Sequence, residues 1–68
     1  IFEVGVPEGW IGKSIGDLDI RRKFGISILG IKHAGKTDVS VTPDTILSGD
    51  GSILVLGEYK ALQKCFRI

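Results

Sequence analysis

Two short segments of this 68-residue chain carry apolar side chains on both faces of an extended strand. They are residues 26–33, ISILGIKH, and residues 53–57, ILVLG. Because side chains alternate along a strand, we expect Ile26 and Ile28 on one face and Leu29 and Ile31 on the other. A sheet built from such strands needs cover on both faces, and this requirement restricts the fold more than any other feature.

The length allows a single small domain, and we assign residues 1–68 to it. A domain of this size buries only about 60% of the surface that its unfolded chain exposes, so a staple or a partner is expected to add stability. One cysteine, Cys65, excludes an internal disulfide and is predicted to pack as a small hydrophobe. No Cys/His cluster indicates a metal site, and the lone His33 is predicted to lie at the surface.

The spacing of apolar residues and the capping and terminating residues predict the other elements in the N-terminal half. Residues 1–6, IFEVGV, predict a strand with alternate apolar side chains on one face, namely Phe2, Val4 and Val6. Residues 14–24 predict a helix that Ser14 caps and Gly25 ends, with a bend where Asp19 caps a second turn.

The C-terminal half continues with strands and a helix. Residues 34–36 predict a hairpin loop, and residues 37–42 a strand with Val39 and Val41 facing inward, stopped by Pro43. Residues 43–52 predict a loop anchored by the apolar pair 46–47, and residues 58–67 a helix with Tyr59, Leu62 and Phe66 at helical spacing.

The expected order is therefore β-α-β-β-β-α, a small α+β domain. Two helices and one small sheet cannot cover both faces of the two-sided strands. We expect the helices on one face of the sheet and a second copy of the chain over the other, which makes a two-fold dimer the predicted state.

Residues 30–37, GIKHAGKT, match the phosphate-loop pattern G-x-x-x-x-G-K-[ST]. A true phosphate loop opens a helix at its Lys and Ser/Thr. Here the following residues are β-branched and alternating, and Pro43 forbids a helix longer than about one turn. We therefore interpret Gly35 and Lys36 as part of a hairpin turn.

Composition excludes several functions. Nine basic and eight acidic residues give a net charge of +1, which does not indicate the basic surface that binding of nucleic acid requires. No apolar run is long enough to span a bilayer, and the residues given do not form a basic-then-apolar leader pattern, so we expect no direct membrane insertion. The chain lacks methionine, and we expect it to be part of a longer or processed protein. No catalytic constellation occurs, since Asp17 and Asp19 diverge on a helix, so an enzyme is not predicted.

Five short motifs in register resemble the TrkA C-terminal domain, often called RCK-C, of potassium channel and transporter regulatory subunits. They are Gly12-Lys13-Ser14, Leu18-Asp19-Ile20-Arg21, Phe24-Gly25, Pro43-Asp44-Thr45 and Gly49-Asp50. The resemblance covers nearly the whole chain.

This resemblance implies a cytoplasmic homodimer that binds a small regulatory ligand near its seam. It also implies a partner, a membrane transporter or channel subunit, reached through an N-terminal lobe or a membrane domain that this chain lacks. The domain is then expected at the inner face of the cell membrane. In one branch of the family the ligand is cyclic di-AMP, and no other cofactor or metal is implied.

The resemblance and the residue chemistry together indicate a candidate half-site for that ligand. Arg21 is the predicted phosphate contact because its planar fork suits phosphate. Ser27 stands where cyclic di-AMP binders of the family tend to carry Asn, and its hydroxyl can still donate. The remaining candidates are an apolar wall of Pro43, Ile20, Ile15 and Phe2, and polar contacts from Lys36 or His33.

Three alternatives stay open at the level of sequence. The basic run Arg21–Lys23 also suits a solvated helix end, where cations favour the helix dipole. The domain could be a structural dimerisation lobe without a ligand. It could also sense a cation through carboxylates such as Glu3, Asp38 or Asp50.

Overall fold

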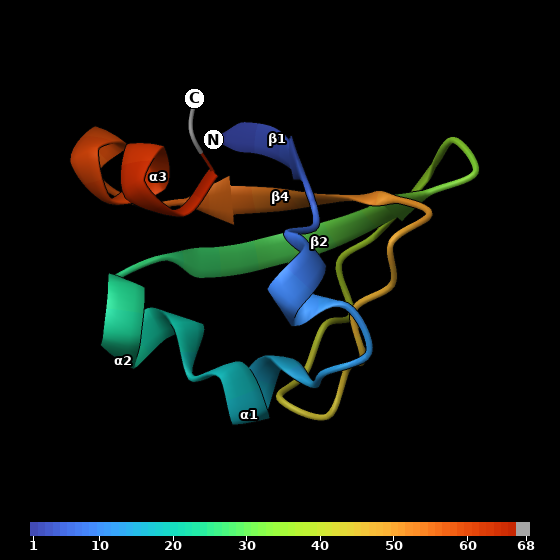
Figure 1. The fold of residues 1–68 in the computed structure, drawn as a ribbon. Coiled ribbons are helices and arrows are strands. Elements are labelled where there is room, and N and C mark those ends of the chain that lie inside the picture. The colour runs from blue at the N-terminus through green and yellow to red at the C-terminus, as the bar shows by residue number, and fades with distance from the viewer. Residues whose placement is uncertain (67–68) are drawn as a thin grey trace.

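The computed structural model describes residues 1–66, which form a four-stranded sheet in the order β1-β4-β2-β3 with every neighbouring pair antiparallel. Figure 1 shows β4 between β1 and β2. The strands are β1 (Phe2–Gly5), β2 (Ser27–His33), β3 (Lys36–Asp38) and β4 (Ser52–Leu56). The helices are η1 (Glu8–Trp10), α1 (Ile15–Leu18), α2 (Ile20–Phe24) and α3 (Tyr59–Phe66). The predicted α+β fold and the order of its main elements are confirmed.

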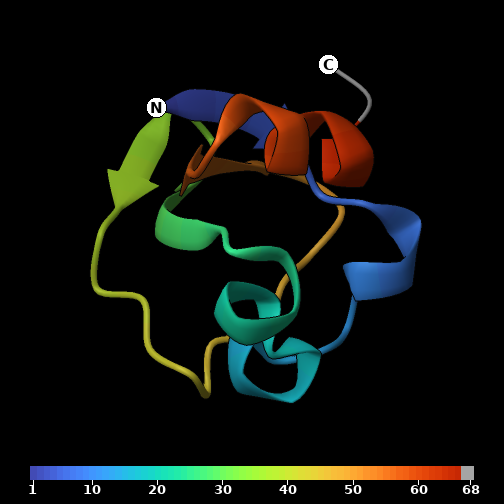
Figure 2. The same ribbon diagram turned by 90° about the vertical axis from the view of Figure 1, so that its left-hand side faces the viewer.

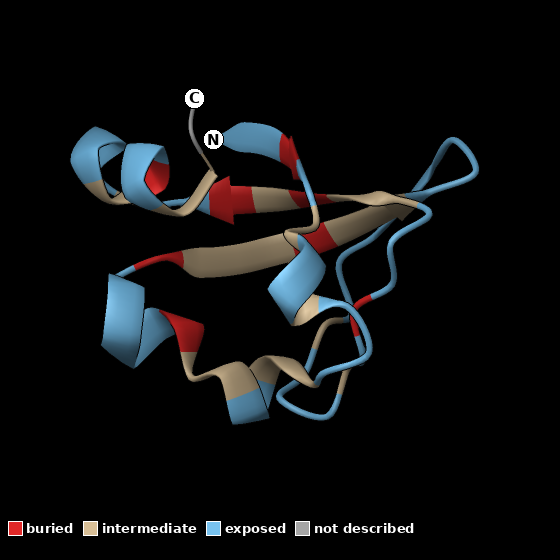
Figure 3. Ribbon diagram, in the orientation of Figure 1, coloured by how far each residue is buried: buried red, intermediate tan, exposed pale blue. Residues whose placement is uncertain are grey.

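The core lies between the sheet and the helices. Val4 pairs with Ile53, and Phe2 with Val55, so these four side chains share one face of the sheet. Figure 3 shows the buried positions gathered along the strands, α2 and α3. The fully or nearly buried core residues are Val4, Ile20, Ile26, Leu47, Ile53, Val55 and Leu62. Because Ile20 of α2 and Leu62 of α3 belong to this single cluster, the helices cover the same face of the sheet.

A β-bulge in β2 changes which of its side chains face the core, compared with the pattern predicted from the sequence. Ile28 pairs with Val55 and Ile31 with Ile53, with a register shift between Ile28 and Gly30. Leu29 is the extra residue of the bulge and has no partner on β4, so the alternation of side chains is shifted by one position after it. Ile28 and Ile31 therefore both face the core, and not opposite sides of the sheet. In β4, residues 53–56 carry apolar side chains on both faces, whereas the prediction of a two-sided β2 was wrong for Ile31.

The predicted bent helix is confirmed, but the bend has a different cause. The Ser14 hydroxyl accepts the N–H of Asp17 at 3.1 Å, as expected of an N-cap. Asp19 separates α1 from α2 in the left-handed conformation, with φ 50° and ψ 43°, and its side chain makes no cap hydrogen bond. Its carboxylate instead pairs with Arg22 at 2.8 Å. Gly25 ends α2 with φ 69° and donates to the carbonyl of Arg21, as predicted.

The phosphate-loop pattern forms a hairpin, as predicted. Ala34 and Gly35 have φ of 53° and 78°, the combination that a tight two-residue hairpin loop requires. His33 pairs with Lys36, and the chain then enters β3 and not a helix.

The strand predicted over residues 37–42 stops at Asp38. The Asp38 carboxylate accepts the N–H of Ser40 at 2.8 Å, which diverts the backbone from the strand ladder. Val39 is consequently 72% exposed, so its predicted inward position was wrong, while Val41 is half-buried.

The loop before β4 keeps one of its two predicted anchors. Leu47 is buried in the core, whereas its neighbour Ile46 is 58% exposed. After β4, α3 covers Tyr59–Phe66, and the predicted last helical residue, Arg67, lies outside the described residues. Within residues 1–66 no helix has the length and apolarity needed to cross a bilayer.

Among the described residues, no helix covers the face of the sheet opposite the core, and we call it the open face. Leu54 and Leu56 of β4 point to it, because they alternate with the buried Ile53 and Val55. Val39 joins them, since a Cβ added to Gly30, which pairs with Leu54, would meet Val39 Cγ1 at 3.5 Å. Leu56 is 49% exposed. The apolar part of the open face is therefore formed by Leu54 and Leu56 of β4 together with Val39.

Candidate functional site

A pocket of about 210 Å³ lies at the edge of β2, between the α1–α2 pair and the segment that follows β3. It forms because β3 pairs only with residues 31–33 of β2 and leaves the first half of that strand uncovered. Figure 2 views the molecule from the end at which β2 begins and α2 ends. The lining residues are Ile15, Ile20, Arg21, Ile26, Ser27, Ile28, Val41, Thr42 and Pro43.

Backbone hydrogen bonds fix the pocket wall that contains Pro43. The N–H of Gly16 donates to the Pro43 carbonyl at 2.7 Å, and the N–H of Ile15 donates to the Thr45 carbonyl at 3.0 Å. Ser14 also forms a β-bridge with Ile46. The first N–H groups of α1 are therefore already satisfied, and binding of an anion falls to a side chain.

Arg21 is the cation at this pocket, and its neighbour Arg22 is not. Arg21 lines the pocket, is exposed, and makes no ion pair within the described residues. Arg22 faces solvent with 84% of its side chain exposed and pairs with Asp19. Arg21 and Arg22 carry the same charge and are adjacent in the sequence, but only Arg21 lines the pocket.

Two hydroxyl groups lie at the same pocket. Ser27 begins β2, and its pairing with Leu56 places it on the open face. Thr42 accepts the N–H of Asp44 at 3.2 Å through its hydroxyl oxygen, which leaves the hydroxyl proton available to a ligand. With Ile15, Ile20 and Pro43 as walls, the pocket offers one cation, two hydroxyls and an otherwise apolar surface.

The structure gathers five of the eight predicted site residues. Arg21, Ser27, Pro43, Ile20 and Ile15 share the pocket. The other three lie elsewhere on the protomer. Phe2 packs against Tyr59 with ring centroids 6.2 Å apart, Lys36 begins β3, and His33 contacts Asp50. A role for these three in ligand binding stays a prediction that requires a second copy.

Four pocket residues were absent from the predicted site, namely Ile26, Ile28, Val41 and Thr42. The Thr-Pro-Asp-Thr run at residues 42–45 is a signal that could have identified Thr42, because clustered hydroxyl and carboxyl side chains around proline favour a tight turn. That turn is present: the N–H of Thr42 donates to the Thr45 hydroxyl at 3.0 Å.

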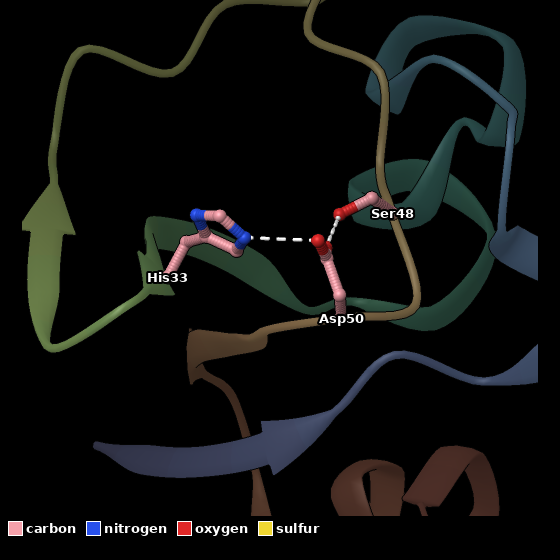
Figure 4. A network of polar contacts seen from close by, with 3 residues as sticks. All are labelled: His33, Ser48 and Asp50. Carbon is pink, nitrogen blue, oxygen red and sulfur yellow. Dashed lines mark hydrogen bonds and ion pairs between the residues drawn. The ribbon is translucent and has the colours of Figure 1, made fainter.

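A second polar cluster joins the end of β2 to the loop before β4 (Figure 4). His33 Nε2 lies 2.9 Å from Asp50 Oδ2, and Ser48 donates its hydroxyl proton to Asp50 Oδ1. The Ser48 hydrogen bond, then His33, lowers the pKa of Asp50 below its ordinary value. The carboxylate lies between the serine and the imidazole, so the imidazole does not activate the serine as in a catalytic triad.

The carboxylates considered for cation sensing have separate partners. Glu3 accepts the Ser52 hydroxyl proton at 2.7 Å and lies 3.5 Å from Lys32 Nζ, and these contacts lower the pKa of Glu3. Asp38 accepts a backbone N–H, and Asp50 belongs to the cluster above. Within residues 1–66 no three His, Cys, Asp or Glu side chains gather as a metal site. Cys65 packs half-buried against the core, and burial raises the pKa of its thiol.

Residues 1–68 match the family model of the TrkA-C domain. The chain is 36% identical over 52 residues to the Ktr system potassium uptake protein A of Bacillus subtilis (strain 168), which covers 76% of this chain and 23% of that protein. It is 29% identical over 58 residues to an uncharacterized transporter of Bacteroides thetaiotaomicron, covering 85% and 11%. The chain thus spans a quarter or less of these relatives.

Solved structures of the same fold include three informative neighbours. The RCK C domain of the potassium transport protein KtrA, in complex with cyclic di-AMP, has a TM-score of 0.83 and 32% identity, covering 93% of this chain and 74% of that one. The RCK_C domain dimer of S. agalactiae BusR, also with cyclic di-AMP, has 0.78 and 27%, covering 97% and 93%. The GsuK channel has 0.81 and 26%, covering 97% and 12%.

The family model covers the entire chain, and the fold matches RCK C domains over nearly its full length. This chain therefore belongs to the TrkA-C domain family, which confirms the resemblance inferred from its sequence motifs.

Proposed function

We propose that this chain is the regulatory ligand-binding and dimerisation domain of a potassium or other cation transport system, and that cyclic di-AMP is its ligand. The observation that carries the proposal is the pocket at the edge of β2. It sets Arg21, without an ion-pair partner among the described residues, against the apolar wall of Ile15, Ile20 and Pro43. A cation beside an apolar wall matches a phosphate beside an adenine.

The size of the pocket supports a half-site. Drug-sized ligands are usually held in cavities of about 300–1,000 Å³, and this pocket has about 210 Å³. A cyclic dinucleotide has two equivalent halves, and each protomer of a two-fold dimer offers the same pocket once. One ligand per two chains is the stoichiometry that this symmetry requires.

The open face supports the dimer. Leu54, Leu56 and Val39 present apolar surface that the helices do not cover, and Ser27 brings that face to the rim of the pocket. A second copy on this side would shield the leucines and place two pockets near one two-fold axis. The complexes of KtrA and of the BusR RCK_C dimer with cyclic di-AMP support a dimer that binds this ligand.

Regulation follows from this geometry as a difference in affinity. A ligand that bridges two protomers favours the relative orientation in which both half-sites contact it, and this preference is worth about 1–3 kcal/mol in typical coupled systems. The parent protein would transmit that preference to a membrane transporter or channel subunit from the cytoplasmic side. The potassium uptake relative supports this context.

Isothermal titration calorimetry with cyclic di-AMP tests the proposal. We expect saturation at one ligand per two chains. Arg21→Ala should weaken binding by about ten- to hundredfold, because it removes charge-assisted hydrogen bonds to phosphate. Arg22→Ala is the matched control, since it removes an equal charge from the adjacent position outside the pocket.

The two alternative functions, a structural dimerisation lobe and a cation-sensing lobe, predict different results in calorimetry and in thermal-shift measurements. A structural dimerisation lobe gives no heat with cyclic di-AMP at millimolar concentration although the chain is dimeric. A cation-sensing lobe shows a thermal shift with divalent cations that chelation removes and that Glu3→Gln or Asp50→Asn abolishes. Equal loss in Arg21→Ala and Arg22→Ala would show that general charge, and not the pocket, attracts the ligand.

A further inference from the structure

A groove between α2 and α3 has no place in the ligand-binding proposal. Lys23 and Phe24 from the end of α2 form one wall, and Lys60 and Lys64 from α3 form the other, with Ala61 on the floor. Both helices lie at the end of the molecule that faces the viewer in Figure 2. The groove and the Arg21 pocket have no lining residue in common, so the two surfaces can be altered separately.

The charges of the chain are segregated onto these two helices. Five of the nine basic residues lie on α2 and α3, and none of the eight acidic residues does. In the groove, Lys23, Lys60 and Lys64 are exposed and make no ion pair within residues 1–66. With Arg21 in the other pocket and Arg22 paired with Asp19, the groove itself carries three lysines against one carboxylate, Glu58.

The spacing of the lysines places two like charges side by side. Lys60 and Lys64 are four residues apart and occupy the same face of α3, an arrangement in which like charges repel and destabilise the helix. Glu58 is the only acidic residue in the groove, and it precedes the helix. The counter-charge that would relieve the repulsion is therefore expected from another molecule.

The surface beside the lysines is partly apolar. Phe24 is 41% exposed and rests on Trp10 with ring centroids 6.1 Å apart, while Ala61 and Cys65 are half-buried. A lipid surface would contact projecting side chains, whereas this groove lies between two helices, both of which contribute lysines to its lining. Such a groove suits a chain segment that places an apolar side chain between its own carboxylates.

We propose that the α2–α3 groove binds an acidic protein segment, with one apolar side chain against Phe24 and Ala61 and carboxylates against Lys23, Lys60 and Lys64. This surface goes beyond the ligand-binding function proposed above and does not depend on it. It provides the domain with a second contact, on the helical side of the sheet, opposite the open face.

Fluorescence anisotropy tests this groove, with a fluorescein-labelled peptide of Asp and Glu residues around one central Phe and no cyclic di-AMP present. We expect saturable binding to the 68-residue chain that weakens as salt rises. Lys64→Glu should weaken it by at least about tenfold, because it replaces an attraction by a repulsion.

Lys13→Glu is the matched control, since it makes the same charge reversal at an exposed lysine outside the groove. It should change the affinity by less than about twofold at physiological salt, where distant charges are screened. Circular dichroism melts show that each variant is folded. Absence of peptide binding, or equal weakening in both variants, overturns the proposal. Binding to phosphatidylserine vesicles that displaces the peptide also overturns it, and assigns the surface to lipid.

Discussion

Single backbone contacts set the shape of the pocket, and Gly16 makes the closest of them. A Cβ at this position would lie 3.0 Å from the Pro43 carbonyl oxygen and 3.1 Å from Pro43 Cβ. The neighbour is a proline and a backbone carbonyl, neither of which can rotate away. The Gly16 position therefore holds the Pro43 wall against α1 through the 2.7 Å hydrogen bond between them.

Gly16→Ala should move that wall. We expect a loss of about 1–3 kcal/mol in unfolding free energy from overpacking, measured by urea denaturation, and weaker cyclic di-AMP binding by calorimetry. Gly5→Ala is the control, because a Cβ there meets nothing within 4 Å. Equal stability of the two variants would show that the 43–45 segment adjusts freely.

The Asp50 cluster makes stability depend on pH in the acidic range. Its contacts with Ser48 and His33 hold the pKa of Asp50 below the ordinary value of 3.8, so the carboxylate stabilises the fold above that pH. This contribution is lost as the pH falls through the lower folded-state pKa. We therefore expect Asp50→Asn to flatten the acid limb of a plot of unfolding midpoint against pH, and Asp44→Asn, whose carboxylate has no such contacts within residues 1–66, to leave it steep. A steep limb in both variants contradicts the assignment.

At the scale of elements, Leu62 is the one fully buried side chain by which α3 packs on the core, with Ala61, Cys65 and Phe66 partly buried beside it. Leu62 is fully buried in the core, while Gln63 beside it is exposed. We expect Leu62→Ala to cost about 2–5 kcal/mol in unfolding free energy, as large-to-small core substitutions do. Gln63→Ala should change it by less than about 0.5 kcal/mol, as surface substitutions usually do. Similar values for the two variants, measured by chemical denaturation, would mean that α3 is not docked as described.

The elements that follow from local rules were predictable from sequence. Ser14 and Gly25 bracket the bent helix because a hydroxyl cap and a positive φ are local requirements. The hairpin at Ala34-Gly35 was predictable for the same reason. The bulge at Leu29 was not, because an extra residue in a strand is fixed by its partner strand and has no local signature here.

The residues of the candidate site likewise include some that were predictable from the sequence and some that were not. Arg21, Ser27 and Pro43 were named from motif resemblance and residue chemistry, and the fold brings them to one pocket. Val41 and Thr42 were missed because the alternating pattern of residues 37–42 predicts a strand, whereas the Asp38 side chain ends that strand early. The short β3 is also what leaves the edge of β2 uncovered and so creates the pocket.

At the scale of the whole molecule, the sheet has one shielded and one open face. The shielded face holds the core, and the open face exposes Leu54, Leu56 and Val39 beside polar residues. Apolar surface contributes about 25 cal/mol per Å² when water is removed from it, so two small domains gain by covering it together. The account therefore depends on a second copy over the open face.

A charge on the open face should separate the copies without unfolding them. Leu56→Lys places an ammonium group at the half-exposed end of β4, opposite Ser27. We expect light scattering to show monomers for this variant, with the far-ultraviolet dichroism of a folded domain. Gln63→Lys adds the same charge on the exposed side of α3 and should leave the dimer intact. A dimeric Leu56→Lys variant would place the interface elsewhere.

Sedimentation equilibrium of the unliganded 68-residue chain tests the central claim most directly. The account predicts a particle of two chains over the accessible concentration range, because a single copy leaves Leu56 and Val39 of the open face exposed to water. A folded particle of one chain that persists at high concentration would contradict it.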